Sequence, residues 1–308
     1  MKICFVGIGS IAKRHINNLR YIASQRKLDL QIDAFRRSLS YIDGIDHVFT
    51  TFEELPNDYD AVFITNPTDA HLEALRMMQQ KGRNFFIEKP VVALNQVDSA
   101  KKIKLYSDAI YYVACPLRYS AVIQYIKHHM NLENIISVRS ISSSYLPDWR
   151  PGKDYRDTYS AHRNMGGGVS IDLIHEWDYL TYLFGWPERI QCFIGKKSKL
   201  ELDSDDYAIY IAECRDKIIE LHLDYFGRQT VREIELFTGE ETVVGDLVKN
   251  RIIFLKSGQA LDFNEVRDDY QRREIDHFLN MILQIDEPED GFHHALNVLE
   301  LTQGKLLQ

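Results

Sequence analysis

Short apolar runs alternate with longer segments of helical spacing over about the first 115 residues of the chain. Residues 3–6 have the pattern of a buried strand, and residues 11–23 place their apolar side chains on one helical face. The same alternation predicts strands at 30–35, 61–65, 84–87 and 110–115, and helices from about 69 to before Gly82 and over 94–106. Such strand–helix–strand repeats predict a doubly wound α/β domain, in which helices cover both faces of a parallel sheet.

The pattern changes from Tyr119 onward. A helix over 121–130 and a strand over 135–142 lead into about twenty irregular residues ending at Gly168, and a helix over 169–184 follows. Strand patterns separated by turn residues then cover 189–194, 207–214, 218–225, 231–237, 242–248, 252–255 and 260–263, before helices over 270–283 and 294–307. We therefore expect two domains, residues 1–118 and residues 119–308, the second an α+β domain with a large, mostly antiparallel sheet.

Composition narrows the class of protein. A chain of 308 residues with 45% hydrophobic and 27% charged residues agrees with two ordinary globular domains. A net charge of −8 argues against nucleic-acid binding, and no apolar run approaches the roughly 20 residues of a membrane span. A strand pattern follows Lys2 directly, without a signal peptide, so we expect a cytoplasmic protein with no membrane or nucleic-acid partner. Four scattered cysteines and the absence of a metal-ligand spacing favour buried thiols and no metal site.

A glycine-rich turn joins the first predicted strand to the first predicted helix. Its residues have the spacing G-x-G-x-x-A and comprise Gly7, Gly9, Ser10, Ile11 and Ala12. Gly7 would permit the tight turn, Gly9 would let a pyrophosphate approach the backbone, and Ala12 would keep the helix close to the strand. The amide groups at the helix start would attract the phosphates. We favour a dinucleotide-binding (Rossmann) domain over a plain strand–helix turn because the element on each side is the right one.

The end of the second strand bears on the choice between NAD and NADP. Arg36, Arg37 and Ser38 follow the strand directly, and arginine suits the 2′-phosphate of NADP. Asp33 is the competing acidic residue that would favour NAD, but it lies inside the strand pattern. We therefore expect NADP, with NAD as the alternative. The arginines could also be solvated loop charges.

A second group of residues follows the strand at 84–87. Glu88-Lys89-Pro90 lies where strand ends of an open parallel sheet meet their ligands. Together with other short motifs it resembles the Gfo/Idh/MocA family of oxidoreductases, which includes glucose-fructose oxidoreductase and inositol dehydrogenase. The motifs are Gly7-x-Gly9-x-Ile11-Ala12-x-x-His15, Asn66-Pro67-Thr68 with His71, Glu88-Lys89-Pro90, and Gly166-Gly167-Gly168 followed by Asp172 and His175.

The resemblance implies an oxidoreductase that acts at a secondary alcohol, commonly of a sugar, cyclitol or sugar derivative. It places Lys89 near both nicotinamide and substrate, and Asp172 and His175 at the substrate. Besides the glycine turn, we assign Asn66, Pro67, His71, Glu88 and Lys89 to the cofactor. The resemblance also implies a C-terminal sheet that serves in oligomerisation, here a homodimer or homotetramer.

The chemistry of such a reaction agrees with this residue set. Hydride leaves a carbinol carbon only as the hydroxyl proton is removed, which a neutral imidazole does near neutral pH. We assign His175 as the acid/base, Lys89 as electrostatic and proton-relay partner, and Asp172 as the residue that orients them. If 169–184 is one helix, Asp172 and His175 share a face. The spacing of this pair is one residue shorter than is common in the family, and a lone helical histidine is usually a packing residue.

The long loop suggests a substrate class. Residues 149–163 contain four Lys or Arg against two Asp, with interleaved aromatic residues. Aromatic faces suit sugar rings, and arginine suits phosphate or carboxylate. An anionic or nucleotide-linked sugar is one interpretation, and an arm that packs on another domain or subunit is the other. The expected substrate-binding residues are Asp172, His175, Arg118, Tyr119, Trp149, Arg150, Tyr155 and Arg156.

Three functions fit these observations. The first is an NAD(P)-dependent dehydrogenase or reductase of a sugar-like secondary alcohol. The second uses transient oxidation to permit elimination or hydrolysis of a sugar derivative. The third is a non-catalytic NAD(P)-sensing protein, against which Lys89 and His175 argue because a pure sensor needs no acid/base pair.

Overall fold

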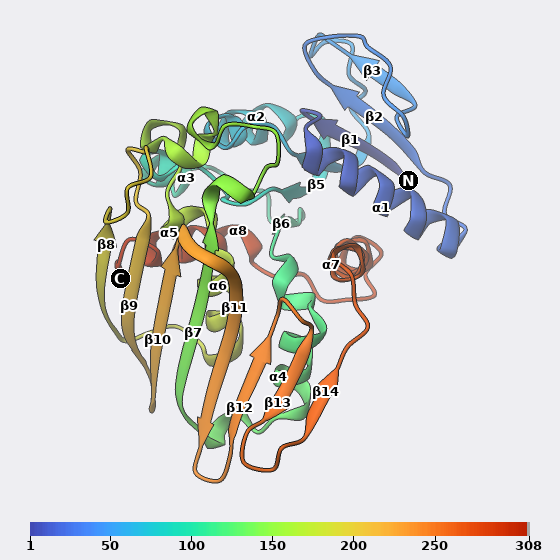
Figure 1. The fold of residues 1–308 in the computed structure, drawn as a ribbon. Helices are drawn as coiled ribbons and strands as arrows, with labels where there is room; N and C mark the ends of the chain where they lie inside the picture. The colour runs from blue at the N-terminus through green and yellow to red at the C-terminus, as the bar shows by residue number, and fades with distance from the viewer. Residues whose placement is uncertain (307–308) are drawn as a thin grey trace. The chain divides into compact units, whose positions relative to one another are not determined.

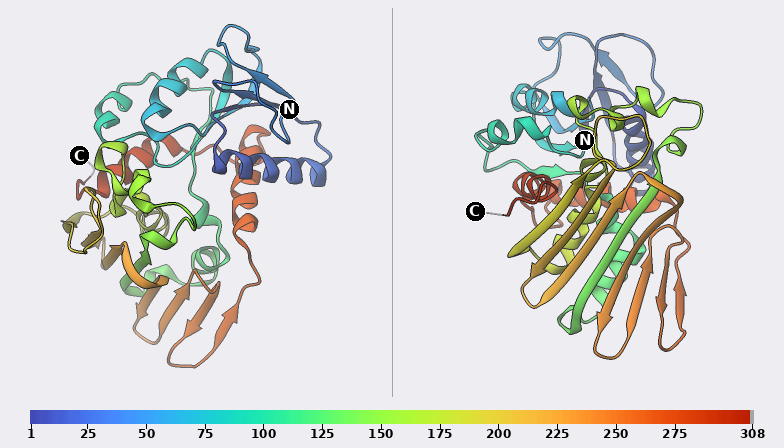
Figure 2. Two further views of the ribbon diagram at one scale, coloured as in Figure 1. Left: turned by 45° about the horizontal axis from the view of Figure 1, so that its top comes forward. Right: turned by 60° about the vertical axis from the view of Figure 1, so that its left-hand side comes forward.

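The computed structural model describes residues 1–306, which form two compact units. The first unit contains Met1–Ala114 and Arg267–Leu296, and the second contains Cys115–Val266 and residues 297–306. Helix α7 (Arg267–Ile282) thus packs within the first unit, where Arg14 and Arg26 of helix α1 (Ser10–Arg26) pair with Asp268 and Asp276. The two helices meet in Figure 2. The domain division at residue 118 stays a prediction.

A six-stranded parallel sheet forms the centre of the first unit (Figure 1). Its order is β3-β2-β1-β4-β5-β6, and the strands are β1 (Lys2–Val6), β2 (Gln31–Phe35), β3 (His47–Phe49), β4 (Tyr59–Ile64), β5 (Gly82–Ile87) and β6 (Tyr111–Val113). The central strands are continuous apolar runs because both of their faces are buried. The doubly wound fold is confirmed, with β3 as a strand that the sequence pattern did not predict.

Aromatic rings fill the core between this sheet and α7. Phe63 stacks between Phe5 and Phe86, with ring centroids 4.7 and 4.6 Å apart. Phe278 of α7 meets Phe86 edge-on at 5.5 Å. This cluster anchors a late segment of the chain to the first unit.

The predicted helix over 94–106 is wrong. Only a 3-10 turn η2 (Leu94–Gln96) and one helical turn α3 (Val97–Ala100) form there. Side chains occupy backbone groups that a continued helix would use: Gln79 donates to the Lys104 carbonyl, and the Tyr111 hydroxyl accepts from the Tyr106 amide. Helix α2 (His71–Met78) follows a 3-10 turn and agrees with the prediction.

The second unit contains an eight-stranded sheet with the order β14-β13-β12-β11-β7-β10-β9-β8, drawn in Figure 1 from β14 at one edge to β8 at the other. Only β7 and β10 pair in parallel, so the predicted, mostly antiparallel sheet is confirmed. The strands are β7 (Ile135–Tyr145), β8 (Arg189–Gly195), β9 (Tyr207–Cys214), β10 (Lys217–Asp224), β11 (Phe226–Thr238), β12 (Thr242–Asp246), β13 (Arg251–Phe254) and β14 (Ala260–Asp262).

Helices cover one face of this sheet. Helix α4 (Ala121–His129) and helix α6 (His175–Phe184) lie behind the strands in Figure 1, and Trp177 of α6 meets Tyr210 of β9 edge-on. The remaining 3-10 turns are η1 (Thr68–Ala70), η3 (Pro116–Tyr119), η4 (Leu132–Asn134), η5 (Leu146–Asp148), η6 (Tyr155–Asp157), η7 (Tyr159–Ala161) and η8 (Arg163–Met165). Helix α8 (Gly291–Leu301) begins and ends earlier than the predicted 294–307, whose last residue lies outside the described part.

The predicted single helix over 169–184 is broken in two. Helix α5 (Val169–Asp172) ends at Leu173, whose φ of −98° and ψ of 34° leave the helical range, and α6 starts at His175. The Asp205 carboxylate accepts from the Ser170 amide and so caps the first piece. Asp172 therefore closes one helix and His175 opens the next, instead of sharing one helical face.

Two further features concern the whole described chain. Within residues 1–306, no helix is both long and apolar enough to cross a membrane. The cysteines are free thiols: Cys4, Cys115 and Cys214 are buried and Cys192 is half-buried. Burial raises the pKa of Cys214 to about 11, as expected for an inert packing thiol.

Candidate active site

The glycine turn has the backbone geometry of a phosphate-binding loop. Gly7 has a φ of +81°, and a Cβ atom added there would lie 2.7 Å from the Cα atom of Asn66. A Cβ atom added at Gly9 would meet no atom of residues 1–306 within 4 Å, so the space in front of that residue is open. Gly9 caps α1 without a side-chain hydrogen bond, which leaves the first amides of a long helix available to an anion. Ala12 is fully buried, as close helix–strand packing requires.

Two more strand ends lie at the same edge of the first sheet. The strand order reverses between β1 and β4, and the crevice at such a point is where open α/β sheets bind ligands. Asn66 follows β4, and its side-chain oxygen is buried without a hydrogen-bond partner among residues 1–306. The buried ring of His71 lies 2.9 Å from the Asn66 carbonyl and 3.1 Å from that of Pro90, so it ties the two loops together. Burial lowers the pKa of His71.

Glu88 follows β5 directly and pairs with the buried His15 of α1, with 2.5 Å between Nε2 and Oε1. Burial by itself would raise the pKa of Glu88, but the hydrogen bond and charge of His15 and the charge of Lys89 outweigh it and lower the pKa. The pair joins the start of α1 to the strand end that carries Lys89. It therefore fixes the backbone on which Lys89 is placed.

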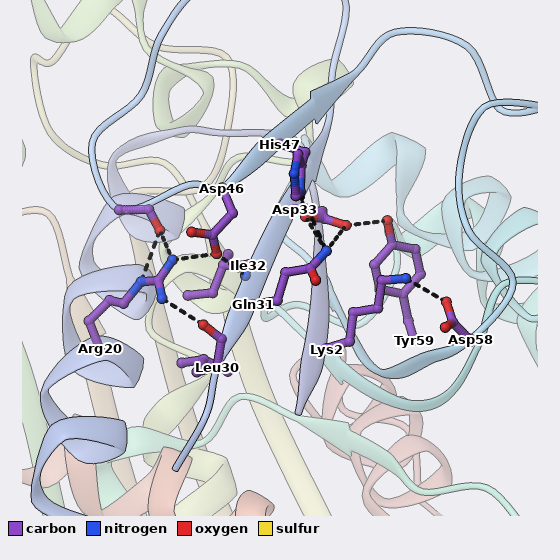
Figure 3. Close-up of polar contacts among 11 residues, drawn as sticks. Lys2, Arg20, Leu30, Gln31, Ile32, Asp33, Asp46, His47, Asp58 and Tyr59 are labelled. Atoms are coloured by element: carbon purple, nitrogen blue, oxygen red, sulfur yellow. Dashed lines mark hydrogen bonds and ion pairs between the residues drawn. The ribbon is translucent and has the colours of Figure 1, made fainter. Parts of the chain in front are cut away.

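Figure 3 shows the contacts of the Asp33 carboxylate within β2 and its surroundings. Its fully buried carboxylate accepts from the Tyr59 hydroxyl at 2.9 Å and from the Gln31 amide at 3.0 Å, and the His47 ring lies 2.9 Å away. Asp33 is thus occupied by three side chains in the middle of β2.

Arg36, Arg37 and Ser38 follow the strand end directly. Arg36 is half-buried, whereas Arg37 and Ser38 are exposed. Within residues 1–306 neither guanidinium forms a hydrogen bond or ion pair with a side chain.

In the second unit, Asp172 is the centre of an aromatic cluster. Its carboxylate is 6% exposed and accepts from the Tyr225 hydroxyl at 2.5 Å. The ring of Trp149 meets Tyr225 edge-on with centroids 5.2 Å apart, and the indole N–H donates to Ser144. Burial, followed by the charge and hydrogen bond of Asp172, raises the pKa of Tyr159, so this second phenol also belongs to the cluster.

His175 lies half-buried in the first turn of α6, and two acidic residues of the same turn form ion pairs. Glu176 is fully buried and pairs with Arg232 of β11 at 2.7 Å. Asp178 receives two hydrogen bonds from Arg118 of η3, at 2.6 and 2.9 Å. These pairs fix the first turn of the helix to the elements around it.

The predicted substrate residues differ in the partners that their side chains have within the protein. The Arg118 guanidinium is nearly buried and bound to Asp178, and Tyr119 is the last residue of the same 3-10 turn. Arg156 donates to both oxygens of Asp154 and to Glu201, and the Tyr155 hydroxyl accepts from the Glu201 amide. Arg150 lies over the ring of Tyr159, 5.3 Å from its centroid. The substrate roles of these residues remain predictions.

Several of these contacts were missed from the sequence. Tyr225 carries no local motif, because its contact to Asp172 spans 53 residues. Tyr159 lies in the predicted loop, but its contact to Asp172 depends on the fold of that loop. The pairing of Arg118 with Asp178 likewise spans 60 residues. Lys89 belongs to the first unit and His175 to the second, so their meeting at one nicotinamide also stays a prediction.

Comparison with known proteins identifies the first unit. Residues 1–109 match the model of the oxidoreductase family with an NAD-binding Rossmann fold, Gfo/Idh/MocA. Residues 1–109 are an NAD-binding Rossmann domain of that family. The resemblance carried by the short motifs is thereby confirmed.

One curated relative of the chain is myo-inositol 2-dehydrogenase of Thermotoga maritima. It is 24% identical over 193 residues, which cover 60% of this chain and 55% of the relative. The chain thus matches about half the length of this relative.

Solved structures extend the similarity of fold to nearly the whole chain. Levoglucosan dehydrogenase in complex with NADH is 14% identical, has a TM-score of 0.82, and the match covers 99% of this chain and 95% of that one. UDP-N-acetylglucosamine 3-dehydrogenase from Acidithiobacillus ferrooxidans is 19% identical with a TM-score of 0.75, over 98% and 95% of the two chains. At such identities the likeness establishes the two-unit fold.

Proposed function

We propose that the protein is an NAD(P)-dependent oxidoreductase that transfers a hydride between a nicotinamide and a secondary alcohol or ketone of a sugar-like molecule. The observation that carries this proposal is the glycine turn, where Gly7, the open space at Gly9 and the uncapped start of α1 lie where the sheet order reverses. The names of its relatives, which include an inositol dehydrogenase and a nucleotide-sugar dehydrogenase, support a polyhydroxylated substrate.

The residues of the first unit fit a dinucleotide. The turn amides and the α1 terminus would hold the pyrophosphate, and the unpartnered side-chain oxygen of Asn66 is a buried acceptor beside Gly7. Pro67, His71, Glu88 and Lys89 would hold the remainder. His71 would act by tying the loops after β4 and β5 together, and Glu88 by its pair with His15 of α1. When bound, the nicotinamide supplies the acceptor or donor of a hydride.

The chain itself would supply proton chemistry and electrostatics. We assign His175 to take up or return the hydroxyl proton, a step that a base within hydrogen-bond reach makes possible. Lys89 would stabilise negative charge on the same oxygen. Asp172 is buried and already bound to Tyr225, so it suits the positioning of substrate and phenols better than proton transfer.

The cofactor preference follows from the side chains at the end of β2. Arg36 and Arg37 have no side-chain partner within the described residues, whereas Asp33 is occupied by three. Positive charge at this position suits a 2′-phosphate, and we propose NADP as the preferred cofactor over NAD.

Cofactor binding tests both assignments. NADPH should bind more tightly than NADH in calorimetry, and Arg36→Ala with Arg37→Ala should reduce the preference by about tenfold or more. Asp33→Asn is the matched control, which should lower stability and leave the preference unchanged. Tighter binding of NADH by the unmodified protein would overturn the NADP assignment, and no affinity for either nucleotide would overturn the function.

Turnover distinguishes the proposed function from its alternatives. Absorbance of the reduced nicotinamide is followed while the protein is incubated with sugars, cyclitols and nucleotide-linked sugars. Net oxidation or reduction supports the proposal, and His175→Asn should abolish it while nicotinamide binding persists. Product without net redox change would indicate elimination or hydrolysis through a transient oxidation, and binding without turnover would indicate a sensor.

We also propose that copies associate through the helix-free face of the second sheet. Phe193, Ile211 and Ile218 lie on that face of neighbouring strands, with 69%, 53% and 48% of each residue exposed. Adjacent exposed apolar side chains commonly mark an interface. Ile211→Glu should lower the mass measured by sedimentation, and an unchanged mass, or a monomeric unmodified protein, would refute this arrangement.

A further inference from the structure

A tight turn in the long loop brings two cationic residues together. In Arg150-Pro151-Gly152-Lys153 the Lys153 amide donates to the Arg150 carbonyl at 3.1 Å, and Gly152 has a φ of +80°. Proline at the second position and a glycine of positive φ at the third are typical of a type II β-turn, whose first and fourth Cα atoms lie within about 7 Å. The sequence of the turn thus makes Arg150 and Lys153 neighbours.

Both cations line one shallow hollow of the second unit, together with Trp149, Tyr155 and Ser160. Among the described residues, none that lines the hollow is acidic. Within residues 1–306 neither the Arg150 guanidinium nor the Lys153 ammonium is paired with a carboxylate. Two neighbouring like charges without a counter-charge repel each other, and an anion between them would relieve that repulsion.

Arg156 of the same loop provides a contrast. Its guanidinium is bound to both oxygens of Asp154 and to one oxygen of Glu201. Its charge is therefore balanced within the protein, and its donors are largely occupied. The sequence pattern treats Arg150 and Arg156 alike, but only Arg150 keeps its hydrogen-bond donors for a ligand.

The hollow is linked to Asp172 through single aromatic side chains. Arg150 lies over Tyr159, whose hydroxyl is hydrogen-bonded to Asp172. Trp149 packs on Tyr225, whose hydroxyl donates to Asp172. A ligand held at Arg150 and Lys153 therefore lies one aromatic layer from the carboxylate assigned to the substrate.

We propose that the Arg150–Lys153 turn is an anion subsite that binds a carboxylate or phosphate group of the substrate. The planar guanidinium would take two anionic oxygens, the ammonium a further contact, and the ring of Tyr159 would hold the guanidinium in place. This inference rests on the proposed function, since it takes Asp172 and His175 to mark the reacting end of the same substrate.

The test compares charged probes with an uncharged one by calorimetry on the full chain, with and without saturating NADPH. The probes are glucose, glucuronate, glucose 6-phosphate and UDP-glucose. At least one anionic probe should bind about tenfold more tightly than glucose at low salt, and the one that does identifies a carboxylate or a phosphate as the group recognised. Arg150→Ala and Lys153→Ala should each weaken that probe by about 10- to 100-fold, whereas Arg156→Ala should change it by no more than about twofold.

Equal affinity for charged and uncharged probes, or an equal loss in Arg156→Ala, would overturn the anion subsite. The melting temperature and NADPH affinity of each variant show that a lost probe affinity does not come from misfolding. The two proposals also fail separately. If the protein binds NADPH but prefers no anionic probe, only the anion subsite is refuted. If it prefers an anionic probe but has no affinity for a nicotinamide nucleotide, the proposed oxidoreductase function is refuted.

Discussion

The candidate site of the first unit consists mainly of backbone groups, whereas that of the second unit consists mainly of side chains. In the first unit, the ligand would meet backbone: the turn at Gly7 and Gly9, and the amides that begin α1. In the second unit, it would meet side chains gathered from separate segments, such as Asp172, Tyr225 and Arg150. A backbone site depends on a few torsion angles fixed by neighbouring residues, whereas a side-chain site depends on contacts across the whole unit.

This difference predicts opposite responses to substitution. The glycine turn should be damaged by adding a single methyl group, because it needs space. The second site should be damaged by removing a single hydroxyl group, because it needs a specific donor. Gly7→Ala and Tyr225→Phe test this contrast. Glu88→Gln, which removes a charge from the first unit, lies between them when the three are ordered from the largest expected effect to the smallest.

Gly7→Ala should lower both the stability of the protein and its affinity for a nicotinamide nucleotide. An L-residue at a φ of +81° is strained, and the added Cβ would lie 2.7 Å from Asn66, so we expect a loss of about 2 kcal/mol or more in the free energy of unfolding. Gly9→Ala is the control, because its methyl group would meet no atom of the described part of the chain within 4 Å. It should leave stability unchanged while weakening nicotinamide binding by about tenfold or more. Urea unfolding and calorimetry measure the two effects, and equal nicotinamide affinity of Gly9→Ala and the unmodified protein would contradict a pyrophosphate at this turn.

Glu88→Gln should destabilise the first unit in a pH-dependent way. The pKa of Glu88 is lower in the folded protein than its ordinary value of 4.5, so the ionised carboxylate stabilises the fold fully above that value. This contribution is lost as the pH falls through the lower, folded pKa. Near neutral pH, the free energy of unfolding of the variant should be about 2 kcal/mol lower than that of the unmodified protein. This difference should become smaller below pH 4.5.

Urea unfolding at a series of pH values measures this gap for Glu88. Asp58→Asn serves as a comparison, because Asp58 pairs with Lys2 at the surface and its loss should produce a much smaller gap. A gap for Glu88→Gln that stays constant from pH 7 to pH 3.5 would show that its ionisation does not support the fold.

Of the three substitutions, Tyr225→Phe should cause the smallest loss in the free energy of unfolding. It removes the hydroxyl that donates to the buried Asp172, a charge-assisted bond worth about 1.5–3 kcal/mol when the partner is left unsatisfied, and the second phenol, Tyr159, offsets part of this. Tyr210→Phe is the matched control, since its hydroxyl donates to the neutral carbonyl of Thr302. Tyr225→Phe should lose more stability than Tyr210→Phe and leave NADPH binding unchanged; an equal loss would mean that the Asp172 charge does not strengthen the contact.

Much of the fold followed from periodicity. The parallel sheet and the mostly antiparallel sheet were both predicted, because the strands are short apolar runs or alternating patterns with clear turns. The helix over 94–106 was wrong because side chains such as Gln79 and Tyr111 hold the segment in another conformation. The break at Leu173 was missed because residues 169–184 contain no glycine or proline that would mark a helix end.

By itself the sequence determined the glycine turn, the strand–helix alternation and the motif set of an oxidoreductase family. These are local properties: the torsion freedom of Gly7 and the amides of α1 are fixed by residues within a few positions. The tertiary structure alone decided which charges are balanced. Arg118 pairs with Asp178 and Arg156 with Glu201, whereas Arg150 lies over the ring of Tyr159 and has no carboxylate partner within residues 1–306. An ion pair depends on a few ångströms of separation between distant segments, and spacing along the chain carries no record of that distance.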